Sequence, residues 1–375
     1  MTWEQKSLDE IGFIGRGKSR HRPRNAEHLY GGEYPFIQTG DIKAANFRIT
    51  AFSQTYNEAG LLQSKLWKEG TLCITIAANI ADTAILGMDA CFPDSVIGFV
   101  ADESKSDVRF VKYFFDVFQA RMKSISTGAA QDNLSLEKLL TFKIPTPPLP
   151  TQRRIASILS AYDDLIESNL KRIKLLEEKA SIMYKLLREE LNNCIKVNLF
   201  DFAEIQMGFA FKAEAFNEDG DGTPIIRIRD IPKQRTKSYT TQEVDSNYFV
   251  EKGDLLIGMD GEFHMNEWLG QRGLLVQRVC RLRAFNPIFQ SYLWQALKAP
   301  IHYYETTISG ATVAHLGKKH LEEIFVQMPS KIMFSVMEEL NMMLKLKINL
   351  ADQNNQLLVA RDILLPRLMR GEIEV

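Results

Sequence analysis

The sequence lacks the short motifs by which most enzyme classes are recognised. It has no Asn-Pro-Pro-Tyr or Asp-Pro-Pro-Tyr element of an amino-methyltransferase, no His-Glu-x-x-His and no Gly-x-Ser-x-Gly. Its six histidines are not spaced as metal ligands. These absences argue against zinc-hydrolase and serine-hydrolase chemistry, and we expect no catalytic or metal-binding residues in this chain.

Cysteine, long apolar runs and net charge are also scarce. The four cysteines, Cys73, Cys91, Cys194 and Cys280, form no Cys-x-x-Cys pair, which predicts reduced thiols in a cytoplasmic protein. No apolar run reaches the length of a membrane span, and the N-terminus shows no signal-peptide core, so we expect no membrane association. The net charge of −1 argues against nucleic-acid binding by bulk charge alone, although local basic surfaces remain compatible with it.

The sequence does contain an internal repeat with a period of roughly 180–190 residues. The matched pairs, in chain order, are PFIQTGDI (35–42) with PIIRIRDI (224–231), LWKEGTLCI (66–74) with FVEKGDLLI (249–257), and STGAAQDNL (126–134) with ISGATVAHL (308–316). Three matches in the same order and at nearly constant offset indicate a duplication.

Each copy is predicted to be a mixed α/β domain followed by a long helix. In the first copy we expect strands in 33–39, 70–77 and 95–101 and a helix over 109–125; in the second we expect strands in 223–231, 253–259 and 274–284 and a helix over 289–299. The predicted organisation is a first α/β domain over 1–148, a helix over 149–196, a second α/β domain over 197–328 and a second helix over 329–375.

The two long helices carry heptad patterns that predict an antiparallel coiled coil. The first follows a proline-rich segment, with Thr151 as its expected N-cap, and its seam is Ile155, Leu159, Tyr162, Ile166, Asn169, Ile173, Leu176, Ala180, Met183 and Leu187. The second has Val336, Met343, Leu350, Leu357 and Leu364 at one heptad position, and Leu340, Lys347, Asn354, Arg361 and Leu368 at the other. Two separate solvated helices are the alternative, but the first seam is too apolar to leave in water.

Several segments resemble the specificity subunits of type I restriction–modification systems. PPLPTQRRIASIL (147–159) and DDLIESNLKRIKLLEEK (163–179) are similar to the family's central conserved helix, and RDILLPRLMRGEI (361–373) to its C-terminal ending. GKSRHRPRNAEHLYGGEYPFIQTGDI (17–42) resembles one subclass of its first target-recognition domain. Two departures are Thr151, where the family usually has glutamate, and the polar middle of the second helix.

The resemblance implies a DNA-recognition role without chemistry. Each α/β part would be a target-recognition domain that reads one half of a bipartite, asymmetric site in double-stranded DNA. The paired helices would set the spacer and dock two modification methyltransferase subunits, with restriction and translocase subunits in the full complex. This chain would bind no cofactor, whereas S-adenosylmethionine, ATP and magnesium would be bound by the partner subunits. The implied fold is two mixed α/β domains separated by an antiparallel pair of helices, with an internal pseudo-twofold repeat.

Residues suited to DNA contact occur at related places in the two copies. Arginine and lysine suit phosphates, and arginine and glutamine suit guanine and adenine edges. The candidates are Arg16, Lys18, Arg20, Arg22 and Arg24 in a basic loop that also holds His21; Gln38 and Thr39; Lys212, Arg227 and Arg229; and Gln131, Asn133, Thr312 and His315. Arg227 and Arg229 alternate with isoleucines, which predicts a strand with one polar face. Ordinary solvated surface is the alternative reading for all of them.

One motif supports a rival function. GFIGRGKS (12–19) matches the phosphate-loop pattern, so a nucleotide hydrolase that uses Lys18 is an alternative. A phosphate loop requires a helix directly after it, and Pro23 would interrupt such a helix. Aligning residues 10–11 with 204–205 places Lys212 opposite Lys18 and leaves the second copy without either glycine, which weakens this alternative.

Two further alternatives rest on weaker patterns. A coiled-coil scaffold carrying two ligand-binding domains would fit the same domain organisation. The spacing of Asn217, Asp219 and Asp221 resembles a calcium loop, but Ile228 stands where a bidentate glutamate is needed. A turn before a strand is the better interpretation of that segment.

Overall fold

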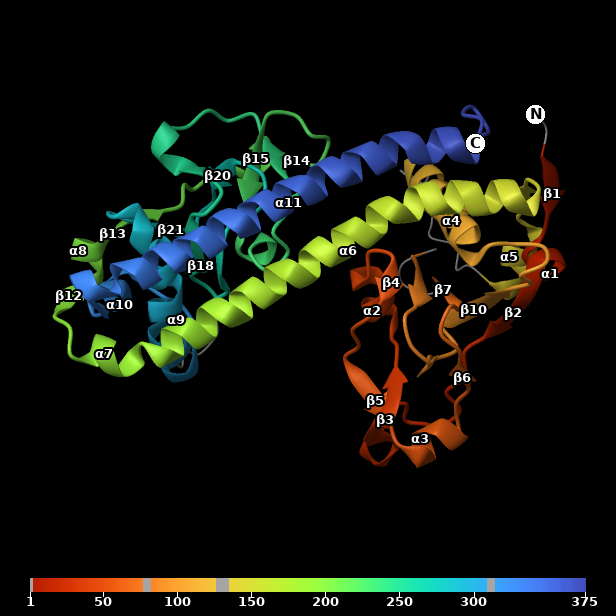
Figure 1. The fold of residues 1–375 in the computed structure, drawn as a ribbon, viewed down its shortest axis with the longest axis horizontal. Helices are drawn as coiled ribbons and strands as arrows, with labels where there is room; N and C mark the ends of the chain where they lie inside the picture. The colour runs from red at the N-terminus through yellow and green to blue at the C-terminus, as the bar shows by residue number, and fades with distance from the viewer. Residues whose placement is uncertain (1–2, 77–81, 126–134, 309–313) are drawn as a thin grey trace. The chain divides into compact units, whose positions relative to one another are not determined.

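The computed structural model describes residues 3–76, 82–125, 135–308 and 314–375 (Figure 1). The chain divides into two compact units, one formed by Met1–Ile166 with Gln356–Val375 and the other by Glu167–Asn355. Each unit contains one mixed α/β domain together with parts of both long helices. None of the helices in the described residues is long and apolar enough to cross a membrane.

The first unit is built around a mixed sheet covered by one long helix. The sheet has the strand order β2-β10-β7-β8-β4, formed by Gly12–Arg16, Val96–Ala101, Leu72–Thr75, Thr83–Leu86 and Arg48–Ile49. A second sheet has the order β5-β3-β9-β6 (Gln54–Tyr56, Tyr30–Phe36, Ala90–Cys91 and Leu66–Trp67), and β1 (Glu4–Lys6) pairs with β11 (Ile144–Thr146). Helix α4 (Val108–Ile125) packs Phe110 and Phe115 against Leu72, Ile74 and Phe99 of the main sheet. The short helical elements are α1 (Leu8–Ile11), η1 (Glu27–Leu29), α2 (Thr39–Ala44), α3 (Glu58–Leu62) and α5 (Leu136–Thr141).

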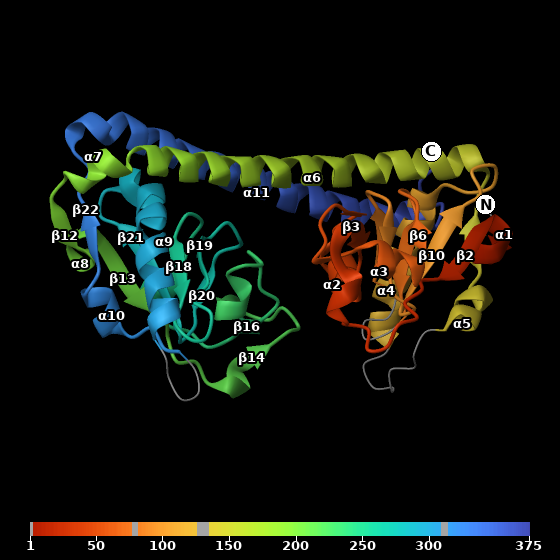
Figure 2. The same ribbon diagram turned by 90° about the horizontal axis from the view of Figure 1, so that it is seen from below.

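The second unit repeats this plan. Its main sheet has the order β13-β21-β18-β19 (Ala203–Met207, Val279–Ala284, Leu255–Gly258 and Met265–Glu267), and helix α9 (Gln290–Thr307) lies along it (Figure 2). A second sheet has the order β14-β16-β15-β20-β17 (Phe216–Asn217, Tyr239–Thr240, Thr223–Ile226, Gly273–Leu275 and Phe249–Val250), and β12 (Lys196–Asn198) pairs with β22 (Phe325–Gln327). The short helical elements are α7 (Arg188–Asn192), α8 (Leu199–Phe202), η2 (Ala213–Ala215), η3 (Ile228–Asp230), η4 (Ser246–Tyr248), η5 (Pro287–Phe289), α10 (Lys318–Glu322) and η6 (Lys331–Met333).

The strand pairing confirms the internal repeat. Strand β10 lies between β2 and β7 in the first unit, and β21 lies between β13 and β18 in the second, all antiparallel. Strands β3 and β9 are parallel neighbours, as are β15 and β20. The matched turns in LWKEGTLCI and FVEKGDLLI each place a glycine in the left-handed region, Gly70 with φ 84° and Gly253 with φ 92°.

The strand predicted over 223–231 is wrong in its second half. Strand β15 ends at Ile226, and Arg227 is the N-cap residue of the 3-10 turn η3, so Arg227 and Arg229 do not alternate along a strand. The reason lies in Asp230, whose carboxylate accepts a hydrogen bond from the Arg227 backbone N–H at 3.0 Å. In the first unit, Asp41 in the first turn of α2 accepts from the N–H of the N-cap residue Gln38 at 2.8 Å. The aspartate shared by the two repeats is therefore a helix-capping residue.

The strand predicted over 274–284 is also divided. It forms β20 and β21, separated by a turn at 276–278 in which Arg278 has a left-handed φ of 73°.

The N-cap prediction for the first long helix is wrong too. Helix α6 (Leu149–Leu186) begins two residues before Thr151, and Pro150 occupies the first turn, where a missing N–H breaks no helical hydrogen bond.

The coiled-coil seam is confirmed within each unit. None of the predicted seam residues of α6 or α11 (Phe334–Met369) is exposed. In the second unit the Asn169 amide donates to the Asn354 Oδ1 at 2.9 Å, and Lys179 pairs with Glu339 at 2.8 Å. A residue further along α6 pairs with a residue earlier in α11, so the two helices run antiparallel.

The polar positions of α11 each have a specific partner. Lys347, with a side chain 1% exposed, forms an ion pair with Glu267 of β19, and Glu177 of α6 lies 3.7 Å from its Nζ. In the first unit Arg361 pairs with Asp163, which also accepts a hydrogen bond from the Tyr113 hydroxyl at 2.5 Å. The polar residues in the middle of the second helix therefore pair with specific residues of the first helix or of the adjoining domain.

Candidate nucleic-acid interface

The predicted basic loop of the first unit follows strand β2 and is held by its own backbone. The Gly17 N–H donates to the Val96 carbonyl at 2.8 Å, and the Lys18 N–H donates to the Phe92 carbonyl at 3.0 Å. The Ser64 hydroxyl donates to the Lys18 carbonyl at 2.7 Å. Arg16, Arg20, Arg22 and Arg24 are exposed, and Lys18 and His21 are half-buried.

Asp94, in the turn between β9 and β10, organises part of this loop. Arg24 Nη2 lies 2.7 and 2.9 Å from the two carboxylate oxygens of Asp94, and Arg22 Nη2 lies 3.8 Å away. Arg22 also donates to the carbonyls of Ser19 and His21, both at 2.8 Å. The two arginines therefore have fixed positions while each stays about half exposed.

The phosphate-loop match is not a phosphate loop. Residues 12–16 form strand β2, paired with β10, and no helix occurs in the described residues 17–26. Gly17 has a structural role, because a Cβ there would lie 2.2 Å from the Pro93 carbonyl oxygen. In the second unit a Cβ on Gly208 would lie 2.1 Å from the Val276 carbonyl oxygen, and its N–H donates to the Val279 carbonyl.

This pairing corrects the sequence alignment of the two loops. Gly208 is the counterpart of Gly17, and Phe209 is the counterpart of Lys18, so the match between Lys18 and Lys212 was wrong by three residues. The second copy thus keeps a glycine and lacks the lysine. Because the shared glycine is required by a close backbone approach, it carries no argument for nucleotide binding.

Gln38 and Thr39 lie at the beginning of α2, where the strand β3 has already ended. Both side chains are half-buried, and the Gln38 amide donates to Gln54 Oε1 at 2.5 Å. This places Gln38 beside the exposed Gln54 of β5. The predicted residues Gln131, Asn133 and Thr312 lie outside the described residues.

Arg227 and Arg229 have different environments despite their proximity. The Arg227 guanidinium donates to the Ser238 hydroxyl and lies 5.7 Å from the centre of the Phe216 ring. Burial, with a smaller effect of the neighbouring Arg229, lowers the pKa of Arg227. Arg229 and the predicted Lys212 are exposed. Of the two arginines, Arg229 is the one placed to meet a ligand.

A second basic segment, which is not among the residues predicted from the sequence, follows η3. Lys233, Arg235 and Lys237 are all exposed, whereas Thr236 and Ser238 between and after them are buried. The alternation of basic and small polar residues in KQRTKS was the signal for a loop with one exposed cationic face. Together with Arg229, these residues give the second unit an exposed basic segment of its own.

His315 is brought together with two residues that sequence analysis did not consider. Its Nδ1 lies 2.6 Å from Asp260 Oδ1, and Arg278 Nε lies 3.4 Å from Asp260 Oδ2. Asp260 follows strand β18, and Arg278 lies in the turn between β20 and β21. The turn between β20 and β21 places Arg278 beside Asp260. A continuous strand over 274–284, as the sequence predicts, would contain no such turn, so the cluster could not be predicted.

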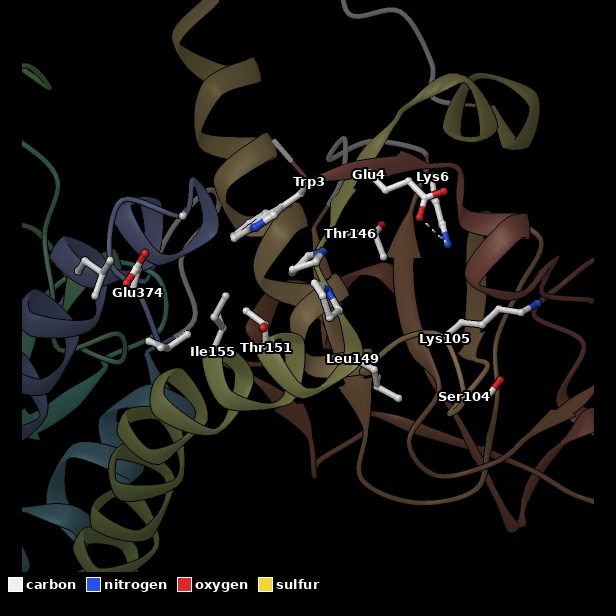
Figure 3. A pocket seen from close by; sticks show the side chains of 15 residues that line it. Trp3, Glu4, Lys6, Ser104, Lys105, Thr146, Leu149, Thr151, Ile155 and Glu374 are labelled. Carbon is white, nitrogen blue, oxygen red and sulfur yellow. Dashed lines mark ion pairs between the residues drawn. The ribbon is translucent and has the colours of Figure 1, made fainter. Parts of the chain in front are cut away.

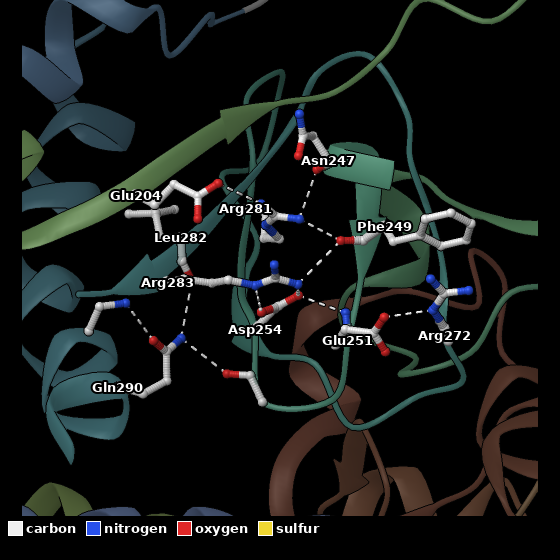
Figure 4. A network of polar contacts seen from close by, with 12 residues as sticks. Glu204, Asn247, Phe249, Glu251, Asp254, Arg272, Arg281, Leu282, Arg283 and Gln290 are labelled. Atoms are coloured by element: carbon white, nitrogen blue, oxygen red, sulfur yellow. Dashed lines mark hydrogen bonds and ion pairs between the residues drawn. The ribbon is translucent and has the colours of Figure 1, made fainter. Parts of the chain in front are cut away.

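Two other arginines of the second unit are structural. Figure 4 shows Arg281 and Arg283 of β21 directed toward Glu204, Asp254 and the backbone carbonyl of Phe249. Arg281 is 1% exposed, and Arg283 Nε lies 2.6 Å from Asp254 Oδ1. Burial lowers the pKa of Arg281, whereas the hydrogen bond to Asp254 raises that of Arg283. Their charges are neutralised within the domain and do not contribute an exposed basic surface.

The first unit contains a cavity of about 920 Å³ in which the N-terminal strand, the beginning of α6 and the C-terminal segment meet (Figure 3). The lining includes Trp3, Thr146, Leu149, Ile155 and Ile373, and Glu4 pairs with Lys6 at 3.1 Å. Among the described residues that line it, none is a predicted DNA-binding residue. Among the described residues of the whole chain, no group of three or more histidine, cysteine, aspartate or glutamate side chains is placed to hold a metal ion.

Comparison with known proteins explains the duplicated plan. Residues 1–178 and 193–341 match the type I restriction modification DNA specificity domain. The chain belongs to this family. It is 33% identical over 136 residues to the type I restriction enzyme EcoBI specificity subunit of Escherichia coli, which covers 36% of this chain and 29% of that protein. It is 31% identical over 186 residues to a putative type I restriction enzyme MjaX specificity subunit of Methanocaldococcus jannaschii, covering 49% of this chain and 42% of the relative.

These sequence matches therefore span less than half of each relative. A solved structure extends the likeness to almost the whole chain. The type I restriction-modification system S subunit from M. genitalium superposes with a TM-score of 0.55 at 19% identity, over 98% of this chain and 96% of the other. At this identity the likeness concerns the fold, and it confirms the predicted fold class.

Proposed function

We propose that this chain is the DNA sequence-recognition subunit of a type I restriction–modification complex. Each α/β domain reads one half of a bipartite, asymmetric site in double-stranded DNA. The observation that carries the proposal is the duplicated domain of the specificity family, in which each copy presents its own exposed basic segment. In the first unit this segment includes Arg16 and Arg20, and in the second it includes Arg229 and Arg235.

The proposal assigns chemistry to partner subunits. Two modification methyltransferase subunits dock on this chain and bind S-adenosylmethionine, and restriction or translocase subunits supply ATP- and magnesium-dependent steps. The chain itself binds no cofactor and acts by placing DNA before the methyltransferases. The paired helices α6 and α11 set the spacer between the half-sites, a role supported by buried polar contacts such as the Asn169–Asn354 pair, which specify one register.

The test is the methylation pattern that this chain directs. The chain is expressed with its methyltransferase subunit in cells that lack other DNA methylation, and methylated bases are mapped by sequencing. We expect one asymmetric motif made of two short half-sites separated by a spacer of constant length. A continuous palindromic motif, or no motif, would contradict the proposal.

Two measurements on purified material separate the proposal from its alternatives. The mass of the complex should equal one copy of this chain with two methyltransferase subunits, whereas a freestanding scaffold would purify alone. The isolated chain should not hydrolyse ATP. Hydrolysis abolished by Lys18→Ala would favour the nucleotide-hydrolase alternative.

A further inference from the structure

Three separate segments of the second unit meet at Asp260, and their backbones fix the meeting point. The Met259 N–H donates to the Arg278 carbonyl at 2.8 Å, and the Met259 carbonyl accepts from the Leu316 N–H at 2.8 Å. The Gly261 N–H donates to the Ala314 carbonyl at 3.0 Å. Residues 259–261 thus lie between the β20–β21 turn on one side and residues 314–316 on the other. The three side chains of interest are attached to hydrogen-bonded backbone.

The side chains of Asp260, Arg278 and His315 form a charge-compensated cluster. Asp260 uses one carboxylate oxygen for His315 Nδ1, at 2.6 Å, and the other for Arg278 Nε, at 3.4 Å. An ionised carboxylate only accepts hydrogen bonds, so Nδ1 is the protonated ring nitrogen in this contact. Arg278 Nη1 lies 3.4 Å from both ring nitrogens, so the guanidinium lies against the imidazole.

The cluster is accessible and adjoins another candidate contact. The side chains of Arg278, His315 and Asp260 are 49%, 44% and 31% exposed. Strand β18 leads into it, and a Cβ on Gly258 would lie 2.8 Å from Ile228 Cγ2, which places η3 against the same end of the strand. The exposed Arg229 belongs to η3, so two arginines from distant parts of the sequence approach one edge of the domain.

Arg278 occupies a backbone conformation that an arginine rarely adopts. Its φ of 73° is in the left-handed region, which is unfavourable for residues with a Cβ and is the usual place for glycine. Its side chain is also 49% exposed. A strained, half-exposed arginine is favoured when its side chain performs a function that glycine could not.

We propose that Arg278 reads a guanine edge in the DNA half-site of the second domain and that Asp260 and His315 are positioning residues for it. This inference rests on the proposed function and identifies a base-reading residue within it. The contacts of Nε with Asp260 and of Nη1 with the His315 ring orient the guanidinium, and the outer N–H groups of Nη1 and Nη2 at the end of the side chain are left to donate. A fork of N–H donors matches the O6 and N7 acceptors of guanine.

The charge of Asp260 distinguishes a base contact from a phosphate contact. A carboxylate 3.4 Å from Arg278 Nε offsets the positive charge that a phosphate would require, and it repels the phosphate itself. Guanine presents neutral acceptors, so directed hydrogen bonds from a compensated arginine suffice. Holding the side chain in place also lowers the conformational entropy that is lost on binding.

The experiment maps methylation directed by the intact complex carrying Arg278→Ala, Arg278→Lys, Arg278→Gly or Asp260→Asn. We expect one guanine position of the second half-site to lose roughly 10- to 100-fold of its discrimination in Arg278→Ala and Arg278→Gly, with the first half-site and the spacer unchanged. Arg278→Lys keeps the charge but not the fork, so it should lose preference at the same position. Asp260→Asn should relax that position to a smaller extent.

Folding is controlled by two variants. Arg278→Gly relieves the left-handed strain, so the thermal midpoint of the complex should not fall even though base discrimination is lost. Arg272→Ala is the matched control, because Arg272 is a 56% exposed arginine of the same unit, paired with Glu251 at 2.6 Å and stacked on Phe249. It should leave the motif unchanged.

Two outcomes would overturn the inference. An unchanged second half-site in Arg278→Gly would show that Arg278 reads no base. A uniform loss of methylation at all sequences, together with a shallower dependence of DNA affinity on salt, would assign Arg278 to phosphate. Failure of the proposed function itself would appear separately, as the absence of a bipartite motif in the unaltered complex.

Discussion

The two recognition domains share a backbone plan but distribute charge differently around the same turn. In the first domain the β9–β10 turn supplies an acid, Asp94, which holds Arg22 and Arg24 of the loop after β2. In the second domain the corresponding β20–β21 turn supplies a base, Arg278, which is held by Asp260 after β18. In both domains this turn therefore contributes one member of an arginine–aspartate pair, but the sign of the charge it carries and the neighbouring segment it pairs with differ.

The largest test of this comparison exchanges a whole domain. Replacing residues 197–328 with the corresponding segment of a relative of different specificity should change one half of the methylated motif completely and leave the other half and the spacer length unaltered. The reason is that most contacts of each domain lie within its own unit. Sequencing of methylated bases gives both halves in one measurement.

The reciprocal exchange of residues 1–148 is the control for the domain exchange. It should change the opposite half only. If either exchange altered both halves, the domains would not read independently, and the comparison of two autonomous readers would be wrong.

The next largest effect is expected where α11 meets the second domain. Lys347→Met leaves the fully buried Glu267 without its cation and should lower the free energy of unfolding of the second unit by about 3–5 kcal/mol. Hydrogen exchange of the β19 amides measures this locally. Lys345→Met, an exposed position on the same helix, is the control and should have little effect. Lys347→Met combined with Glu267→Gln should recover most of the loss.

The same variant should show a characteristic pH dependence. Burial raises the pKa of Glu267, with Lys347 opposing this effect, so the folded state holds the carboxyl proton more tightly than the unfolded state does. Stability therefore falls as pH rises through the window between the ordinary carboxyl pKa and the raised one. Without Lys347 this slope should steepen, and the deficit of Lys347→Met should be smaller in mild acid than at neutral pH. A pH-independent deficit would contradict the buried-charge explanation.

A shared backbone constraint should give similar effects in both domains. Gly17→Ala and Gly208→Ala each direct a Cβ toward a carbonyl oxygen, of Pro93 and Val276 respectively, and we expect each to cost about 1–3 kcal/mol. Chemical denaturation monitored by hydrogen exchange of the β10 and β21 amides measures the stability of the first and the second domain separately. Gly40→Ala, which meets open space, is the control. A large effect in one domain alone would show that the two loops are not equivalent.

Features that repeat with the backbone could be predicted from the sequence. The seam of α6 was predicted correctly because its apolar residues recur in an unbroken heptad pattern. Strands β7 and β18 were predicted correctly because each is a short apolar run that follows a turn containing a glycine, Gly70 or Gly253. The capping role of Asp41 and Asp230 was not predicted, because an aspartate that ends a strand and begins a helical turn has the same sequence appearance as one within a polar strand face.

The charged contacts were harder to predict, since they join residues far apart in the chain. Asp260, Arg278 and His315 are unremarkable individually, and only the turn at 276–278 brings them together. Lys347 is a second example. In the sequence it is a charged residue in an otherwise apolar seam, and only the structure shows that its partner is Glu267, which is 80 residues away in the chain. The alignment of Lys18 with Lys212 is wrong because the Glu-Ile identity at 10–11 and 204–205 is out of register with strands β2 and β13, whose pairing places Gly17 opposite Gly208.

The smallest expected effect on stability tests the charge reversal between the two turns. Asp94→Ala removes a surface ion pair whose members are about half exposed, so the free energy of unfolding should change by less than about 1 kcal/mol. Without the negative charge of Asp94, the net charge of the surface around Arg22 and Arg24 becomes more positive. DNA affinity should therefore depend more steeply on salt, by roughly one to two units of slope, while preference in the first half-site relaxes.

Asp89→Ala is the matched control for Asp94→Ala, because Asp89 pairs with the exposed Lys68 at 2.7 Å elsewhere in the same domain. It should leave the first half-site unchanged. If Asp94→Ala also left salt dependence and motif unaltered, the pair with Arg24 would be an ordinary surface contact. If instead Asp94→Ala and Asp260→Asn each relax only their own half-site, an aspartate-held arginine is the common device of both domains, supplied from opposite sides of the same turn.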